Sequence, residues 1–155
     1  VPWGGGHKLR GPVFLHQDMS RLVNYGIGGY FGLHRDPFEF RNRVTNRTLT
    51  YSGNRIASFL IYLSEVPLGG YMSFPDLRLL LHPVKNSALF WYNFTPSGHQ
   101  EEQIWHQGCP VVVGEKWIAN KWILSYGNTF VRRCGVREDA TQADIEEDMM
   151  RRYRY

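Results

Sequence analysis

His34 and Asp36, in the stretch HRD, are metal-binding residue types that lie two positions apart. Side chains two apart on an extended strand emerge on the same face, so an imidazole nitrogen and a carboxylate oxygen would point at one spot. None of the neighbouring residues fits the nucleophile that a catalytic triad would need. A metal site, in contrast, would need one more ligand from elsewhere in the chain.

His106 is the best candidate for that third ligand. It lies in a segment that leads toward the last strong strand-like run, whereas His82 precedes a proline and His99 lies in a turn-like stretch. Two histidines and one carboxylate on one face of an octahedron leave three positions open and suit non-haem Fe(II). Such triplets also arise by chance, and the same residue types bind Zn²⁺. The triplet alone therefore indicates a metal site without naming the metal.

Lys116 could decide which chemistry such a metal site performs. The segment 116–124 has the pattern of a strand, and one face of it carries Lys116, Ile118, Asn120 and Trp122. An ammonium group among apolar and aromatic side chains is costly unless an anion arrives. A dicarboxylate that chelates iron at one end would place its far carboxylate there. Periodicity alone is equally compatible with Lys116 pointing to solvent.

The elements that must position these residues are short strands. Segments rich in β-branched and aromatic residues, separated by Gly, Pro, Asn and Ser, predict strands at about 21–25, 30–36, 55–63, 77–82, 87–92, 103–106, 110–113 and 116–124. Many short strands with little helix indicate a sandwich, a barrel or a jelly roll. We expect a helix mainly in 139–152, where Thr141 could cap its N-terminus.

The chain has 155 residues and a mass of 18.1 kDa, which fits one domain with a sizeable core. We expect a weakly patterned segment at 1–20, one domain at 21–136 and a charged tail at 137–155. No apolar run approaches the roughly 18 residues of a membrane span. The formal charge is +4, but lysines and arginines are scattered, which indicates a solvated basic surface and no nucleic-acid groove. Because the chain begins at Val1, we expect a piece of a longer or processed product.

Four stretches together carry a family resemblance: NYGIGGYFGLHRD, NRIASFLIYLSEVPLGG, FWYNF and HQGCPVVVGEKWIANKWI. They resemble the catalytic domain of animal prolyl 4-hydroxylase alpha subunits, which are 2-oxoglutarate- and Fe(II)-dependent oxygenases. The resemblance covers residues 20–135 and implies a mainly β fold, a double-stranded β-helix or jelly roll. It also implies that the iron ligands are His34, Asp36 and His106.

The resemblance assigns further residues. Lys116 and Tyr25 match residues that bind 2-oxoglutarate, while Arg55 and Trp122 match positions associated with substrate binding. The implied activity is hydroxylation of peptidyl proline at C4 in collagen-like or other secreted polypeptides. The cosubstrate 2-oxoglutarate would be converted to succinate and CO₂, and ascorbate would rescue iron that has become oxidised.

Partners and compartment follow from the same resemblance. It implies a procollagen or other proline-containing peptide as substrate, protein disulfide isomerase as a partner subunit, and the endoplasmic reticulum lumen as the location. Cys109 and Cys134 match two family cysteines that bond to each other, which implies an oxidising compartment.

The chain departs from the family pattern at three positions. Phe31 and Met72 stand where the family usually has tyrosine and threonine, and Leu124 stands where it often has histidine. These departures leave a second hypothesis open, a degenerate paralogue that binds peptide or a partner subunit without turnover. A third hypothesis, a zinc hydrolase with the same triplet, is disfavoured by Lys116 and by the resemblance.

Overall fold

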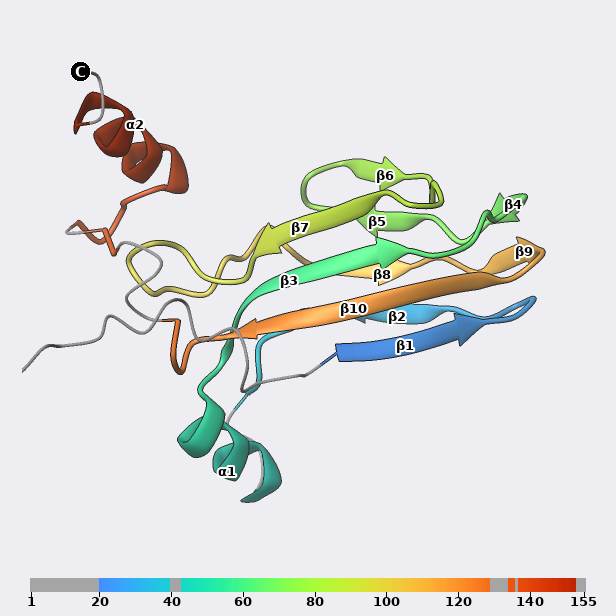
Figure 1. The fold of residues 1–155 in the computed structure, drawn as a ribbon, viewed down its shortest axis with the longest axis horizontal. Helices are drawn as coiled ribbons and strands as arrows, with labels where there is room; N and C mark the ends of the chain where they lie inside the picture. The colour runs from blue at the N-terminus through green and yellow to red at the C-terminus, as the bar shows by residue number, and fades with distance from the viewer. Residues whose placement is uncertain (1–19, 40–42, 129–133, 136, 153–155) are drawn as a thin grey trace, which may run out of the picture.

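Two four-stranded antiparallel sheets face each other in the computed structural model, which describes residues 20–39, 43–128, 134–135 and 137–152 (Figure 1). The strands of the first sheet are, in order, β1 (Ser20–Tyr25), β10 (Lys116–Leu124), β3 (Arg55–Tyr62) and β7 (Ala88–Tyr92). Those of the second are β2 (Phe31–His34), β8 (His106–Gly108), β5 (Met72–Phe74) and β6 (Leu79–Leu81). A short pair, β4 (Leu68–Gly69) and β9 (Val111–Val113), lies at one end. The predicted mainly β jelly roll is confirmed.

Strand β10 organises the first sheet, because it pairs with β1 on one side and with β3 on the other. Its alternating side chains are buried at Lys116, Ile118, Trp122 and Leu124. An inner face of this kind is what a half-buried strand requires. The strand begins and ends at the predicted residues.

The hydrophobic core fills the space between the sheets. Its cluster of buried side chains comprises Leu60, Tyr62, Met72, Phe74, Trp91, Ile104 and Ile118. Both sheets contribute to it, so neither sheet can be removed without exposing the other. Burying a side chain of this size contributes about 1.5–3 kcal/mol relative to leaving it exposed.

Two helices lie at one end of the sheets, α1 (Arg43–Ser52) and α2 (Gln142–Arg152) (Figure 1). Helix α2 was predicted, and Thr141 caps it: the Asp144 N–H donates to Thr141 Oγ1 at 3.2 Å, and the Thr141 N–H donates to Asp144 Oδ2 at 2.7 Å. Helix α1 was not predicted, because its sequence is rich in threonine, a weak helix former, and has no acidic residue in its first turn. Within the described residues no helix is long and apolar enough to cross a membrane.

The strand predictions failed where strands are very short. Strands β4 and β5 were not predicted, and the strand expected at 103–106 lies at 106–108. The strand expected at 30–36 ends at His34, so Asp36 lies in a bend beyond it. Nearly all of the segment predicted at 1–20 lies outside the described residues.

Candidate metal and cosubstrate site

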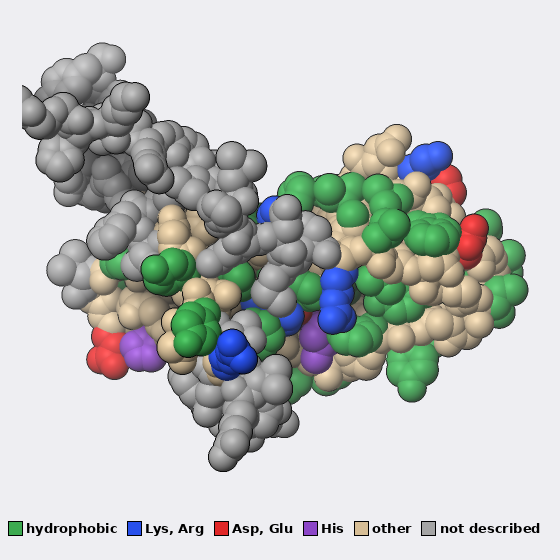
Figure 2. All heavy atoms as spheres, turned by 60° about the horizontal axis from the view of Figure 1, so that its bottom comes forward, with side chains coloured by type: hydrophobic (Ala, Val, Ile, Leu, Met, Phe, Trp, Pro, Cys, Tyr) green, Lys and Arg blue, Asp and Glu red, His purple; other side chains and the backbone are tan. Residues whose placement is uncertain are grey.

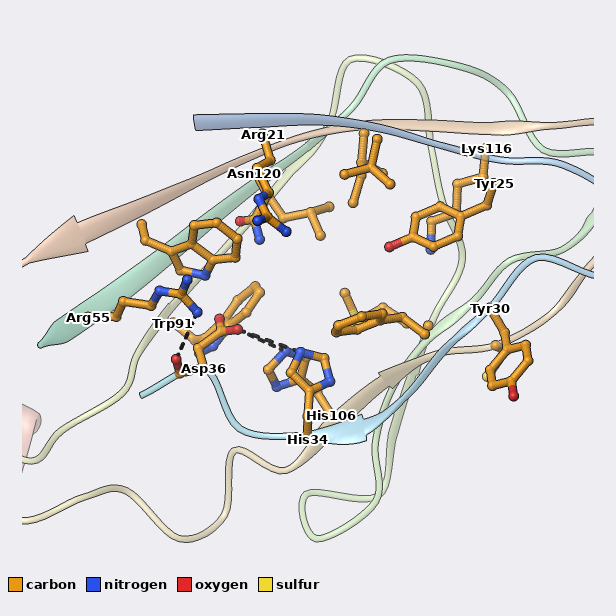
Figure 3. A pocket seen from close by; sticks show the side chains of 18 residues that line it. Arg21, Tyr25, Tyr30, His34, Asp36, Arg55, Trp91, His106, Lys116 and Asn120 are labelled. Carbon is orange, nitrogen blue, oxygen red and sulfur yellow. Dashed lines mark hydrogen bonds and ion pairs between the residues drawn. The ribbon is translucent and has the colours of Figure 1, made fainter. Parts of the chain in front are cut away.

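A cavity of about 300 Å³ opens between the two sheets. Figure 3 shows three groups of side chains around it: His34, Asp36 and His106; Lys116 and Tyr25; and Arg21, Arg55 and Asn120. On the surface in Figure 2, a histidine lies between basic side chains with hydrophobic side chains around them. The cavity therefore joins a cluster of metal-binding residue types to two separate groups of cations.

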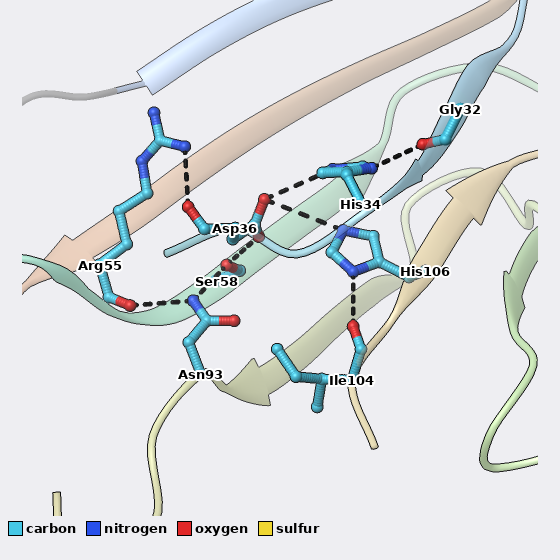
Figure 4. A network of polar contacts seen from close by, with 8 residues as sticks. All are labelled: Gly32, His34, Asp36, Arg55, Ser58, Asn93, Ile104 and His106. Carbon is cyan, nitrogen blue, oxygen red and sulfur yellow. Dashed lines mark hydrogen bonds and ion pairs between the residues drawn. The ribbon is translucent and has the colours of Figure 1, made fainter. Parts of the chain in front are cut away.

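His34 and His106 are direct cross-strand partners on β2 and β8. Their ring centroids lie 4.2 Å apart. Asp36 follows two residues after His34, where the chain bends back toward both rings. One ligand atom from each of the three residues lies within 4.8 Å of the others (Figure 4). The structure thus brings together the triplet singled out in the sequence.

Hydrogen bonds to the backbone orient both imidazole rings. Nδ1 of His34 donates to the Gly32 carbonyl at 2.8 Å, and Nδ1 of His106 donates to the Ile104 carbonyl at 2.9 Å. A nitrogen that bonds to a carbonyl carries the proton, so each Nε2 keeps its lone pair. These Nε2 atoms lie 3.6 and 3.8 Å from Asp36 Oδ1. All three free ligand atoms therefore converge on one point.

A chain of polar contacts fixes the Asp36 carboxylate (Figure 4). Ser58 Oγ donates to Asp36 Oδ2, and Asn93 Nδ2 donates to Ser58 Oγ at 3.0 Å. The Arg55 guanidinium donates to the Asp36 carbonyl at 3.1 Å. Ser58 and Asn93 are fully buried, with 0% of each side chain exposed. Because Oδ2 is occupied, Oδ1 is the oxygen that faces the histidines.

The electrostatics favour the metal-binding forms of Asp36 and His106. Burial raises the pKa of Asp36, but hydrogen bonds and the nearby histidines outweigh it, so the pKa lies below its usual range. Burial lowers the pKa of His106 and favours the neutral ring. Two histidines and one carboxylate are a donor set that fits a divalent iron ion with open positions.

Lys116 lies in the same cavity and is 3% exposed. Its ammonium donates to the Gly70 carbonyl at 2.7 Å and lies 5.9 and 5.5 Å from the ring centroids of Tyr25 and Tyr62. Burial lowers the pKa of Lys116 to about 8, and Cys109 partly opposes the shift. Among the described residues the structure shows no carboxylate in ion-pair contact with Lys116. A buried ammonium in this state favours the arrival of an anion.

Gly70 makes room for this lysine. Its φ is +65°, and an added Cβ would lie 3.4 Å from Lys116 Cδ and 3.2 Å from Val66 Cγ1. A larger residue would be strained by its backbone conformation and crowded against both neighbours. The glycine pair of VPLGG therefore shapes the end of the cavity that holds the ammonium.

Arg55 and Trp122 lie near the triplet. The Arg55 guanidinium stacks 3.8 Å from the centroid of Trp122 and 4.1 Å from that of Phe38. Both Arg55 and Trp122 line the cavity. The residues that the sequence assigned to iron, cosubstrate and substrate all line this one cavity.

Comparisons with known proteins agree with this geometry. The family model described as the 2OG-Fe(II) oxygenase superfamily matches residues 20–124. This chain belongs to the 2OG-Fe(II) oxygenase superfamily. The cofactor and cosubstrate of this superfamily are Fe(II) and 2-oxoglutarate, and the chain carries an intact His-Asp-His triad for the metal.

Individual relatives place the chain within this oxygenase superfamily. Prolyl 4-hydroxylase subunit alpha-2 of Gallus gallus is 43% identical over 131 residues, which are 84% of this chain and 24% of that protein. Subunit alpha-3 of Homo sapiens is 46% identical over 119 residues, 77% of this chain and 22% of that protein. The chain thus spans less than a quarter of the length of these relatives.

A solved structure supports the fold of this oxygenase. The viral collagen prolyl hydroxylase from Paramecium Bursaria Chlorella virus-1, in its 2OG complex, superimposes with a TM-score of 0.54 at 26% identity. The match covers 68% of this chain and 60% of that chain.

The three departures from the family pattern occupy different places in this domain. Phe31 packs edge-on against His34, with centroids 4.3 Å apart, and lines the cavity. Met72 is buried and also lines the cavity. Leu124 is buried at 2% exposure and is not among the cavity-lining residues. Two of the three departures therefore lie where they can affect ligands.

The two cysteines are not bonded to each other in the structure. Cys109 is half-buried and lines the cavity, whereas Cys134 is exposed and follows a stretch outside the described residues. The bond predicted from the resemblance stays a prediction.

Three residues that shape the oxygenase site were missed in the sequence: Ser58, Asn93 and Arg21. Ser58 is an inward-facing polar residue between the apolar residues Ala57 and Phe59 of strand β3, and this pattern could have identified it. Asn93 comes directly after β7 and carries no pattern that marks it. Arg21 and Tyr25 are four positions apart on β1, so their side chains lie on the same face of the strand. Arg21 could therefore have been placed on the cavity side.

Proposed function

We propose that this chain is the catalytic domain of an enzyme that hydroxylates peptidyl proline, in collagen-like or other secreted polypeptides. One arrangement carries the proposal: a His-Asp-His triad and a buried ammonium without a carboxylate partner among the described residues share one cavity. A zinc hydrolase needs no dicarboxylate cosubstrate, so the buried ammonium favours the oxygenase over that alternative. The prolyl 4-hydroxylase relatives supply the substrate class.

The triad residues would hold Fe(II) through Nε2 of His34, Oδ1 of Asp36 and Nε2 of His106. With Fe(II) and 2-oxoglutarate bound, one O₂ would take two electrons from 2-oxoglutarate, which becomes succinate and CO₂, and two from the C–H bond at proline C4, which becomes C–OH; one oxygen atom would go to succinate and the other to the hydroxyl group. The protein favours the neutral ring of His106, fixes Asp36 through Ser58, and presents the three ligand atoms to the cavity.

Lys116 and Tyr25 would hold the far carboxylate of 2-oxoglutarate. Figure 3 shows the two side chains together at one end of the cavity, across from the triad. The Lys116 ammonium has two further donors besides the one bonded to Gly70. Binding the carboxylate would supply the missing counter-ion and favour the charged form of the ammonium.

Arg55 and Trp122 would position the peptide beside the metal. The indole and the stacked guanidinium form a flat wall next to Asp36. Apolar side chains such as Leu60 and Ile118 line the rest of the cavity and would exclude water from the reacting carbon.

Release of labelled CO₂ from 2-oxoglutarate tests this function directly. We expect release that requires Fe(II), rises with a proline-rich peptide, and is matched by hydroxyproline in that peptide. Ascorbate should sustain repeated turnover. Binding of the peptide with no release of CO₂ would favour the non-catalytic paralogue, a reading that Phe31 supports because it brings no hydroxyl group to the metal's neighbourhood.

We also propose the endoplasmic reticulum lumen as the compartment and protein disulfide isomerase as a partner subunit. The relatives are named as alpha subunits, which supports a second subunit. In that compartment Cys109 and Cys134 would form a disulfide, whose closed loop stabilises the fold by about 3.5 kcal/mol in the entropic model.

Mass mapping of non-reduced protein from a secretory host tests this bond. We expect one linked peptide pair that contains both cysteines. Two free thiols in freshly purified material would remove the argument for an oxidising compartment.

A further inference from the structure

Arg21 and Arg55 lie at the corner of the cavity away from Lys116 (Figure 3), and both guanidinium groups lie near the Trp122 ring. Arg55 on β3 lies 3.8 Å from the Trp122 ring centroid, and Arg21 on β1 lies 6.0 Å from it. Arg21 is exposed and Arg55 is half-buried, so this pair lies where the cavity meets solvent.

The two cations repel each other. Burial lowers the pKa of Arg55 most, Asp36 opposes that shift, and Arg21 lowers the pKa further. Within the described ranges neither arginine has a carboxylate in ion-pair contact. Arg55 gives one hydrogen bond to the Asp36 carbonyl, while its buried Nε has no partner in the structure. Like charges held this close are stabilised by an anion between them.

Other polar atoms at the same corner also lack partners. The Trp122 indole N–H and Asn120 Oδ1 are both buried without a hydrogen bond. Trp122 is only 8% exposed, and Asn120 is the cross-strand neighbour of Arg21. A donor and an acceptor side by side fit the backbone of an extended peptide, whose N–H and C=O groups alternate.

The charges of the proposed holoenzyme leave this pair uncompensated. Fe(II), the Asp36 carboxylate, the 2-oxoglutarate dianion and the Lys116 ammonium carry +2, −1, −2 and +1, which sum to zero. Arg21 and Arg55 then add two positive charges with no anion of the site to balance them. The acidic side chains visible in Figure 2 lie mainly toward the two ends of that face.

We propose that Arg21 and Arg55 form a subsite for the carboxylate of an acidic residue next to the target proline. This inference rests on the proposed function and narrows its substrate class to proline with Asp or Glu close by in the sequence. Arg55 serves peptides in general through its stack on Trp122, whereas Arg21 provides the preference for acid.

Matched peptides test the subsite. They carry one proline flanked by Glu or by the isosteric Gln, and binding is measured by fluorescence anisotropy with Mn(II) and 2-oxoglutarate in the absence of O₂. We expect the chain to bind the Glu peptide about tenfold more tightly, since a charge-assisted hydrogen bond of about 1.5 kcal/mol corresponds to that ratio. The preference should shrink as salt is raised.

Variants assign the preference to Arg21. Arg21→Gln should bring the Glu and Gln peptides to equal affinity, and Arg21→Glu should reverse the preference toward a Lys-flanked peptide. Lys85→Gln is the matched control, because Lys85 is exposed in the turn between β6 and β7 and the variant loses the same charge. It should keep the wild-type ratio.

Equal binding of the Glu and Gln peptides by the wild-type chain would overturn the subsite, as would an unchanged ratio in Arg21→Gln. Failure of the proposed function has a different signature: neither peptide is hydroxylated with Fe(II) and O₂. The anisotropy ratio still reports on the subsite in that case, because it needs no turnover.

Discussion

The two ends of the cavity lie between the same two sheets but differ in how far the protein itself supplies partners for their polar groups. At the metal end, both imidazoles, the Asp36 carboxylate and the Ser58 hydroxyl all have hydrogen-bond partners within the protein. At the other end, the buried Lys116 ammonium has one hydrogen bond, to Gly70, and no carboxylate partner among the described residues.

This difference separates a preorganised site from one completed by its ligand. Metal ligands must be fixed within a fraction of an ångström, so the fold gives each of the three ligand side chains a hydrogen-bond partner in advance. A cosubstrate that is consumed in each turnover instead supplies the charge that pairs with a protein group, here the Lys116 ammonium. The lowered pKa of Lys116, about 8, shows that burying the ammonium without a counter-ion is unfavourable.

The largest expected effect is loss of a metal ligand. His34→Ala, Asp36→Ala and His106→Ala should each bring iron-dependent CO₂ release below detection while the fold stays largely intact, as circular dichroism would show. Metal content after dialysis should fall in parallel. Near-normal activity in any one variant would exclude that residue as a ligand and direct attention to His82 or His99.

The support behind Asp36 should come next. Ser58→Ala frees Oδ2 and lets the carboxylate rotate, so metal affinity should fall about 10–100-fold, the range typical for partners of metal ligands. Metal titration monitored by fluorescence would measure it. Ser87→Ala is the control, because its hydroxyl bonds only a turn carbonyl, Val84. Equal metal affinity in both variants would show that Ser58 does not position Asp36.

Lys116 should change cosubstrate affinity and stability in opposite directions. Lys116→Met should raise the KM for 2-oxoglutarate by about tenfold or more, since a charge-assisted bond is worth roughly 1.5–3 kcal/mol. The same variant should melt at a higher temperature without ligand, because it no longer buries a charge. Lys116→Arg should do less harm to binding, and Lys85→Met should change neither quantity. An unchanged KM in Lys116→Met would remove Lys116 from the cosubstrate site.

A pH titration gives the most gradual effect. Below pH 8 free Lys116 is charged and 2-oxoglutarate affinity should be flat; above pH 8 binding must take up a proton. The dissociation constant should therefore rise with pH, approaching tenfold per unit. Lys116→Arg should remove the slope, because arginine stays charged. Calorimetry between pH 7 and about 9.5, with saturating Mn(II), would measure the dissociation constant of 2-oxoglutarate for the wild-type chain and for Lys116→Arg. The same pH dependence in both proteins would assign the titration to another group.

Local pattern was enough to predict several elements and residues. Strand β10 was predicted at its observed bounds, because its alternation is strong and both neighbours are long strands. The HRD stretch identified His34 and Asp36, although the strand ends at His34 and a bend brings Asp36 to the metal. Helix α1 was missed, since its one clear signal is the left-handed glycine that ends it, Gly53, with a φ of +71°.

The sequence by itself determined the residue types of this site: two histidines, a carboxylate and a lysine on a strand whose alternation fits burial. The tertiary structure decided which face is the inner one, because the burial of Lys116 depends on the second sheet packing against β10. It also decided that His106 meets His34, through the pairing of β2 with β8 across nearly half of the chain. Pairing between distant segments leaves no local pattern, and for the same reason Ser58, Asn93 and Arg21 acquired their roles only when the two sheets closed around the cavity.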